Sequence, residues 1–155
     1  MSSLEIIIGN HQDAVEIPVA WLTALEDIGE SAARMAAGFA AIEENSLAHL
    51  ATLEVALVDD ETSARVHIDF MEIPGATDVI TFHHGEIVIG VEVAVRQAEE
   101  YGEPLGREIL RYLVHGLLHL AGHEDAEEED SKAMEAAQEE IVDMLWRGGL
   151  AEKLS

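Results

Sequence analysis

Short apolar runs and one long amphipathic segment make up the first part of the chain. Residues 4–9, 52–60, 78–82 and 85–90 are rich in Ile, Val and Leu and are bounded by glycine or acidic residues, a pattern that predicts β-strands. Apolar residues recur every three or four positions over residues 18–44, and this period predicts one long helix. The last two runs are close enough in sequence to form an antiparallel hairpin.

The chain beyond residue 90 has the apolar period of helices. Residues 91–101, 107–121 and 131–146 carry it, with glycine near the end of each segment, and a short helix is expected over residues 62–70. Strands early and helices late predict an α+β fold, in which helices pack on a small mixed β-sheet. A length of 155 residues with 48% hydrophobic residues is typical of one domain, so residues 1–155 are expected to form a single unit.

The amino-acid composition excludes several kinds of site and of cellular location. There is no cysteine, which excludes disulfides and thiolate metal sites. The amino terminus lacks the basic region and long apolar stretch of a signal peptide, and no run is long enough to cross a membrane. These features predict a cytoplasmic protein without a membrane partner.

The charge balance is strongly acidic. Eight Lys and Arg residues face 32 Asp and Glu residues, for a formal net charge of −24. Nucleic-acid affinity comes chiefly from Lys and Arg contacts to phosphate, so an acidic surface opposes it. A role on RNA therefore requires a local basic patch, a divalent metal or high salt, and adaptation to a saline cytoplasm is one explanation of the acidity.

Metal-ligand residue types gather in the segment HGLLHLAGHED, residues 115–125. His115 and His119 are four residues apart, so both side chains lie on one face of the predicted helix and can share a zinc ion. The alternative is a pair of hydrogen-bonded histidines without a metal. Gly122 is expected to end the helix and turn the chain back toward the same face. The residues that follow it are the candidates for a third ligand, and they are His123, Glu124 and Asp125.

The spacing of this segment favours Asp125 as the third ligand, with His123 as the alternative. In long zinc-protease motifs the third ligand follows the glycine by three residues, which is the place of Asp125. The metal site is thus expected at the end of a central helix, in a layout like that of zinc metalloproteases. Gly116 occupies the place of the glutamate that serves those proteases as general base. The sequence therefore assigns no catalytic base.

Two blocks of the sequence resemble the YbeY family of bacterial metal-dependent endoribonucleases. The segment HGLLHLAGHED resembles that family's H-G-x-L-H-L-x-G-[HY]-D-H, and TDVITF (residues 77–82) with GEIVIG resembles its T-D-V-L-S-F and G-D-I-x-I. The resemblance spans residues 52–146. It implies a single-strand-specific endoribonuclease that matures the 3′ end of small-subunit ribosomal RNA and takes part in ribosome quality control. It also implies one zinc ion per chain, with ribosomal RNA and the small ribosomal subunit as partners and no DNA.

Three departures from the family pattern bear on function. Asp125 stands where the family has its third histidine ligand, and Glu124 replaces an aspartate. Two histidines with a carboxylate also suit iron, so Fe or Ni is an alternative metal. Met71 stands where the family has an arginine; it is expected to be a core residue, and Arg111 is hypothesised to supply the missing positive charge. The alternative functions are a metal-dependent peptidase or other hydrolase, or a non-catalytic metal-binding protein on the ribosome.

Neighbouring polar residues are expected to have structural roles. Thr77 and Asp78 should act as turn and capping residues beside the site. His83 and His84 should lie in a solvated loop between the hairpin strands. The acidic residues 124–130, apart from Asp125, should favour the positive end of the last helix.

Overall fold

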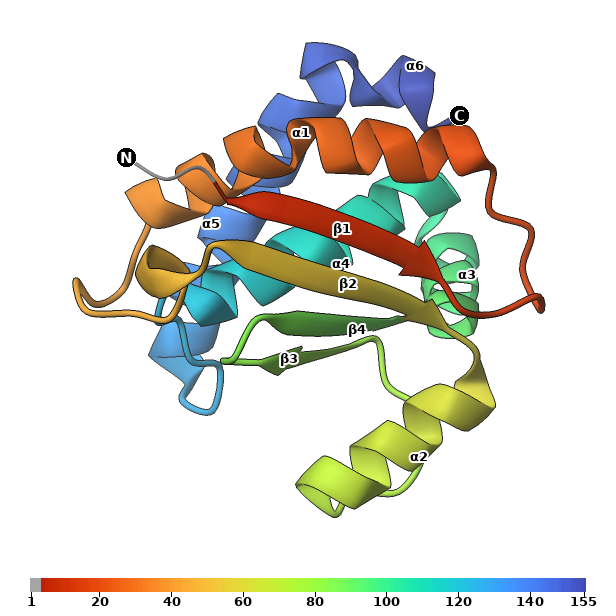
Figure 1. The fold of residues 1–155 in the computed structure, drawn as a ribbon, viewed down its shortest axis with the longest axis horizontal. Coiled ribbons are helices and arrows are strands. Elements are labelled where there is room, and N and C mark those ends of the chain that lie inside the picture. Colours follow the sequence, from red (N-terminus) through yellow and green to blue (C-terminus); the bar gives the residue numbers. More distant parts are fainter. Residues whose placement is uncertain (1–3) are drawn as a thin grey trace.

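A four-stranded mixed β-sheet forms the centre of the computed structural model, which describes residues 4–155 (Figure 1). In spatial order β1-β2-β4-β3, the first three strands run parallel and β3 pairs antiparallel with β4. The predicted hairpin is therefore confirmed. The strands are β1 (Glu5–Asn10), β2 (Thr52–Val58), β3 (Val79–Phe82) and β4 (Glu86–Gly90).

Helices cover the sheet and surround one central helix, α4, which contacts α1, α3 and α5 as well as β3 and β4. This arrangement confirms the α+β prediction. No helix formed by residues 4–155 combines the length and the apolar character needed to cross a bilayer. The helices are α1 (Val19–Gly38), α2 (Asp60–Met71), α3 (Val91–Tyr101), α4 (Leu105–Leu120), α5 (Glu128–Leu145) and α6 (Ala151–Lys153), with a 3₁₀ turn η1 (Leu47–His49) and a π-helical turn η2 (Trp146–Leu150).

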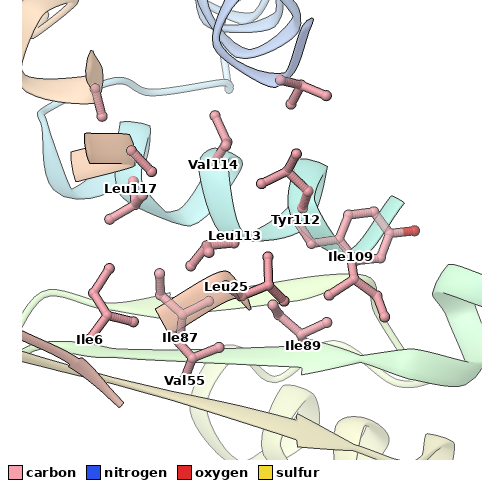
Figure 2. Packing of buried hydrophobic residues seen from close by; sticks show 14 of the residues in the cluster. Ile6, Leu25, Val55, Ile87, Ile89, Ile109, Tyr112, Leu113, Val114 and Leu117 are labelled. Atoms are coloured by element: carbon pink, nitrogen blue, oxygen red, sulfur yellow. The ribbon is translucent and has the colours of Figure 1, made fainter. Parts of the chain in front are cut away.

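The main core lies between the sheet and α4. The strand register aligns Ile8, Val55 and Ile87 in one row across β1, β2 and β4, and all three are buried. Figure 2 shows Val55 and Ile87 on the side of the sheet that faces Leu113 and Leu117 of α4. This packing removes the apolar face of α4 from water and leaves only one edge of the helix for polar side chains.

A smaller apolar cluster lies on the opposite face of the sheet. Val58, Ile80 and Val88 form it, with Val66 of α2 packed against them. Figure 1 shows α2 set apart from the other helices. Asp59 caps α2 by accepting a hydrogen bond from the Thr62 backbone N–H at 2.9 Å, and this bond lowers the pKa of Asp59.

Helix α1 ends at Gly38, and the prediction that it extends to about residue 44 is wrong. Glycine is a poor helix former, and the backbone groups after Gly38 bond to the loop that follows α4 instead of continuing the helix. The Ala41 backbone N–H donates to the Ala121 carbonyl at 3.1 Å, and the Phe39 carbonyl accepts a bond from His123. The segment after α1 therefore braces the loop that follows α4, a long-range contact with no local sequence signal.

Gly116 allows α4 to approach the sheet closely. A Cβ at this position would lie 2.5 Å from Cδ1 and 3.0 Å from Cγ1 of Ile87, a residue that is fully buried. The glycine is therefore explained by packing, because any side chain here would collide with the core.

Gly116→Ala is expected to lower the free energy of unfolding by about 1–3 kcal/mol, because the added methyl overpacks the core. Urea denaturation measures the change. Ile87→Val in the same chain removes Cδ1 and should recover part of the loss. Gly38→Ala is the matched control, since a Cβ there meets nothing within 4 Å. Equal stabilities of the Gly116→Ala and Gly38→Ala proteins would contradict this explanation.

Candidate metal centre

Three predicted ligand residues converge at the carboxyl end of α4. His115 and His119 project from successive turns of α4, and their rings meet edge to face with centroids 4.7 Å apart. Asp125, in the following loop, places Oδ2 at 3.8 Å from Nε2 of His115 and 3.6 Å from Nε2 of His119. One ligand atom from each of the three residues lies within 4.8 Å of the others. The group can therefore hold one metal ion.

Gly122 produces this convergence by turning the chain at the end of α4. It has φ of +98°, and its N–H donates to the His119 carbonyl while the His123 N–H donates to the Leu118 carbonyl, both at 3.0 Å. This pair of bonds is a Schellman motif, for which a left-handed glycine is the favoured residue. The prediction that Gly122 ends the helix and reverses the chain is confirmed.

Each histidine has a hydrogen-bond partner on its Nδ1 atom, the side away from Asp125. Nδ1 of His115 lies 2.7 Å from Oε1 of Gln138, and Nδ1 of His119 lies 2.9 Å from the backbone oxygen of His123. The carbonyl oxygen can only accept, so Nδ1 of His119 carries the proton and Nε2 keeps its lone pair. Partners of this kind orient histidine ligands in metal sites.

The electrostatic environment favours a neutral His119. Burial lowers the pKa of His119 first, and the neighbouring His115 lowers it further, against smaller opposing effects of the His123 carbonyl, Asp125 and Glu124. A neutral imidazole is the form that binds a metal. The same burial that disfavours a proton thus leaves the ring ready for a cation.

The three donors fit a small divalent cation. Bonds of about 2.0–2.1 Å in tetrahedral geometry place ligand atoms roughly 3.3 Å apart. The separations of 3.6 and 3.8 Å from Asp125 exceed this value slightly, and all three donor atoms lie within 4.8 Å of one another, so the side chains close in by a small movement on binding. Because Asp125 is 51% exposed, its side chain has room to make the adjustment.

His123, the alternative third ligand, is directed elsewhere. Its Nε2 lies 2.6 Å from the backbone oxygen of Phe39, and the residue is buried. The ring thus ties the loop after α4 to the end of α1. His123 thus stands next to the ligands in the sequence but has a structural partner, the Phe39 carbonyl.

A pocket of about 540 Å³ opens beside His115 and Asp125. Besides the ligands, it is bordered by α4, α5 and the end of α3, and carboxylates dominate its wall. The acidic residues that line it are Asp78, Glu103, Glu108, Asp125, Glu135 and Glu139, against one basic residue, Arg111.

Arg111 is bound by three carboxylates. Its guanidinium donates to Glu139 at 2.8 and 2.9 Å, to Glu103 at 2.5 Å and to Glu108. Burial alone would lower the pKa of Arg111, but the bonds to Glu139 and Glu103 raise it well above its usual range. Three carboxylates therefore already bind the positive charge of Arg111, which was hypothesised to replace the charge of the family arginine.

Other predicted neighbours of the site have clear places. Met71 is 51% exposed at the end of α2, so its assignment to the core is wrong. Asp78 accepts from the Val79 N–H at 2.7 Å and the Thr77 N–H donates to Ser63 at 2.9 Å, bonds that hold the loop before β3, and Asp78 also lines the pocket beside His115. His83 and His84 are exposed in the hairpin turn and belong to neither the metal group nor the pocket described above; their expected place is confirmed.

Gln138 is the site residue that sequence reasoning missed. It lies on α5, where the other buried residues are Met134, Ala137, Ile141, Val142 and Leu145. A polar residue within an apolar stripe was the available signal, because buried polar groups need partners. The sequence did not show that His115 would be that partner.

The fold and site define this chain as an α+β protein with a candidate His-His-Asp metal centre. The sequence profile of the family described as Endoribonuclease YbeY matches residues 8–146. The chain belongs to the YbeY family.

Named relatives support the assignment. An endoribonuclease YbeY of Myxococcus xanthus is 37% identical over 115 residues, which cover 66% of this chain and 38% of that protein. Those of Mycobacterium sp. KMS and Thermobifida fusca are 34% and 36% identical, covering 66% and 67% of this chain and 68% and 77% of theirs. The solution structure of a Thermotoga maritima protein has the same fold, with a TM-score of 0.62, 24% identity, and coverage of 96% of this chain and 92% of its own.

Proposed function

We propose that this chain is a zinc-dependent endoribonuclease that hydrolyses phosphodiester bonds of single-stranded RNA. The observation that carries the proposal is the convergence of His115, His119 and Asp125 in a chain of the YbeY family. The relatives are named endoribonucleases, which gives the substrate class. The proposed setting is the cytoplasm, in late maturation of the 3′ end of small-subunit ribosomal RNA and in ribosome quality control. Residues 1–155 are proposed to act as one domain.

The proposed ligands are His115, His119 and Asp125. When bound there, zinc would supply a Lewis acid that activates water and polarises a phosphodiester. The two imidazoles present Nε2 lone pairs, because their Nδ1 atoms face Gln138 and the His123 carbonyl. The Asp125 carboxylate neutralises part of the cation's charge, a set of donors that also suits Fe or Ni.

A peptidase mechanism finds no support at Gly116. That position faces Ile87 so closely that a Cβ would lie 2.5 Å from its Cδ1. A glutamate base of the protease type has no room at this place in the helix. A base for peptide hydrolysis would have to come from another element.

The acidic pocket favours a second candidate, a non-catalytic metal-binding protein that associates with the ribosome. Six carboxylates line the pocket beside His115, and its arginine is already bound by three of them. Phosphate groups are repelled from such a wall, especially at low ionic strength. In this case the metal would organise the loop after α4 without cleaving RNA.

Cleavage of a fluorescent single-stranded oligoribonucleotide is the experiment that separates these functions. Protein reconstituted with zinc should cut it, and addition of a chelator should stop the reaction. A matching duplex RNA, a single-stranded DNA and a peptide substrate should remain intact. A His119→Ala protein purified in the same way reports any contaminating nuclease.

The salt dependence of the reaction adds a second readout. Raising KCl from about 0.1 to 1 M shortens the Debye length from about 10 to 3 Å, which screens the repulsion between this acidic chain and RNA. We expect the rate to rise with salt, opposite to the usual behaviour of basic nucleic-acid-binding proteins. RNA that binds without being cut would favour the non-catalytic function, and equal cleavage by His119→Ala would refute the nuclease proposal.

A further inference from the structure

A line of hydrogen bonds connects the Arg111 ion cluster to His115. Nε of Arg111 donates to Oε2 of Glu139 at 2.8 Å, and Nε2 of Gln138 lies 3.0 Å from the same oxygen. Oε1 of Gln138 lies 2.7 Å from Nδ1 of His115. The line therefore runs from α4 to α5 and back to α4, ending on a candidate metal ligand.

The carboxylate at the centre of this line fixes the orientation of the Gln138 amide. Ionised Glu139 can only accept hydrogen bonds, and burial, which would raise its pKa, is outweighed by the Arg111 bond, which lowers it. The amide must therefore turn its NH₂ group to Glu139 and its oxygen to His115. The opposite orientation would place two acceptor oxygens 3.0 Å apart without a proton between them.

The amide orientation in turn fixes the proton on His115. An oxygen facing Nδ1 requires that Nδ1 carry the proton, so the lone pair lies on Nε2. Nε2 is the atom that lies 3.8 Å from Oδ2 of Asp125. Gln138 is only 9% exposed, so water has little access to replace it as the acceptor.

We infer that Gln138 and Glu139 are positioning residues that hold His115 in the Nδ1–H tautomer and so aim Nε2 at the metal. The inference rests on the proposed metal site and names the outer residues that prepare it. Arg111 anchors the line because its guanidinium binds Glu103, Glu108 and Glu139 together. The ion cluster thus has a role in preparing the metal site, in addition to joining α4 to α5.

The tautomer of His115 can be measured directly in the metal-free protein. Two-bond ¹H–¹⁵N spectra at about pH 8 distinguish a protonated ring nitrogen from one with a lone pair. We expect Nδ1–H for His115 in the native chain. His119 provides an internal reference, because its Nδ1 faces a backbone carbonyl that no substitution on α5 removes.

Three variants test separate links of the line. Gln138→Leu removes the acceptor, so His115 should shift toward the Nε2–H form and zinc affinity should fall by about 10–100-fold. Glu139→Gln lets the amide turn either way, so a mixture of tautomers and a smaller loss of affinity are expected. Exchanging the two residues, Gln138→Glu with Glu139→Gln, keeps an acceptor oxygen facing His115 and an amide donor between the pair, so it should retain the Nδ1–H form. Glu140→Gln is the matched control, an exposed glutamate of the same helix outside the pocket lining, and it should change neither readout.

The outcomes separate this inference from the proposed function. Persistence of the Nδ1–H form in both Gln138→Leu and Glu139→Gln would overturn the inference, as would Nε2–H on His115 in the native chain. If Gln138→Leu does not fold, the Glu139→Gln protein and the exchanged Gln138→Glu/Glu139→Gln protein still decide the matter. A native chain with the expected tautomer that binds no zinc in a fluorescent-chelator competition would reject the metal site and leave the hydrogen-bond line intact.

Discussion

Replacing His119 by alanine is expected to abolish stoichiometric zinc binding while the fold is retained. The substitution leaves one imidazole and one half-exposed carboxylate, too few donors for a tetrahedral site. Zinc affinity should fall further than it does on removing a hydrogen-bond partner of a ligand, which lowers it by about 10–100-fold. Alanine is the best helix former, so the last turn of α4 should tolerate it. Metal content after dialysis against trace zinc, measured by atomic emission, gives the zinc bound per chain.

Two other histidines serve as controls for this experiment. His84→Ala removes an exposed histidine of the hairpin turn and should leave one zinc ion per chain. His123→Ala removes the bond to Phe39, so it should lower stability but keep the metal at saturating zinc. Zinc bound equally by His119→Ala and the native chain would place the metal elsewhere, and loss only in His123→Ala would make His123 the ligand.

The site was predictable to the extent that its geometry is local. His115 and His119 are related by the helical repeat, and Gly122 signals the turn that returns Asp125 to them. Each step uses residues within eleven positions of the chain, so helix geometry and glycine conformation carried the prediction. The strands were predictable for the same reason, because a short apolar run bounded by glycine or acidic residues is visible within one segment.

The features that sequence reasoning missed depend on distant contacts. Gln138 meets His115 across 23 residues, and Arg111 meets Glu139 across 28. The end of α1 depends on the bond from Ala41 to Ala121, so the period of its apolar residues overestimated its length. Met71 follows an apolar pattern, yet α2 covers only a small cluster and leaves it exposed. The period of apolar residues identifies the buried face of a helix, but it does not identify which segments pack against that face.

Arg111→Met is expected to cost about 3–5 kcal/mol of the free energy of unfolding, because it leaves a buried charge without its partner. The side chain of Glu108 is 7% exposed and loses the guanidinium it binds, whereas Glu103 and Glu139 are more exposed and can turn toward water. Methionine keeps the apolar stem, so the loss reports the charge and its hydrogen bonds. Urea unfolding of the variant and the native chain measures the difference.

Arg147→Met is the matched control, because Arg147 is 79% exposed and its pair with Asp143 at 3.2 Å is of the surface type. Its cost should stay below about 1 kcal/mol. Adding Glu108→Gln to Arg111→Met removes the stranded charge and should restore part of the stability, since a buried neutral amide costs less than a buried ion. If Arg111→Met were no more destabilising than Arg147→Met, the carboxylates around Arg111 would have to be solvated. The ion cluster could then not hold Glu139 in place beside Gln138.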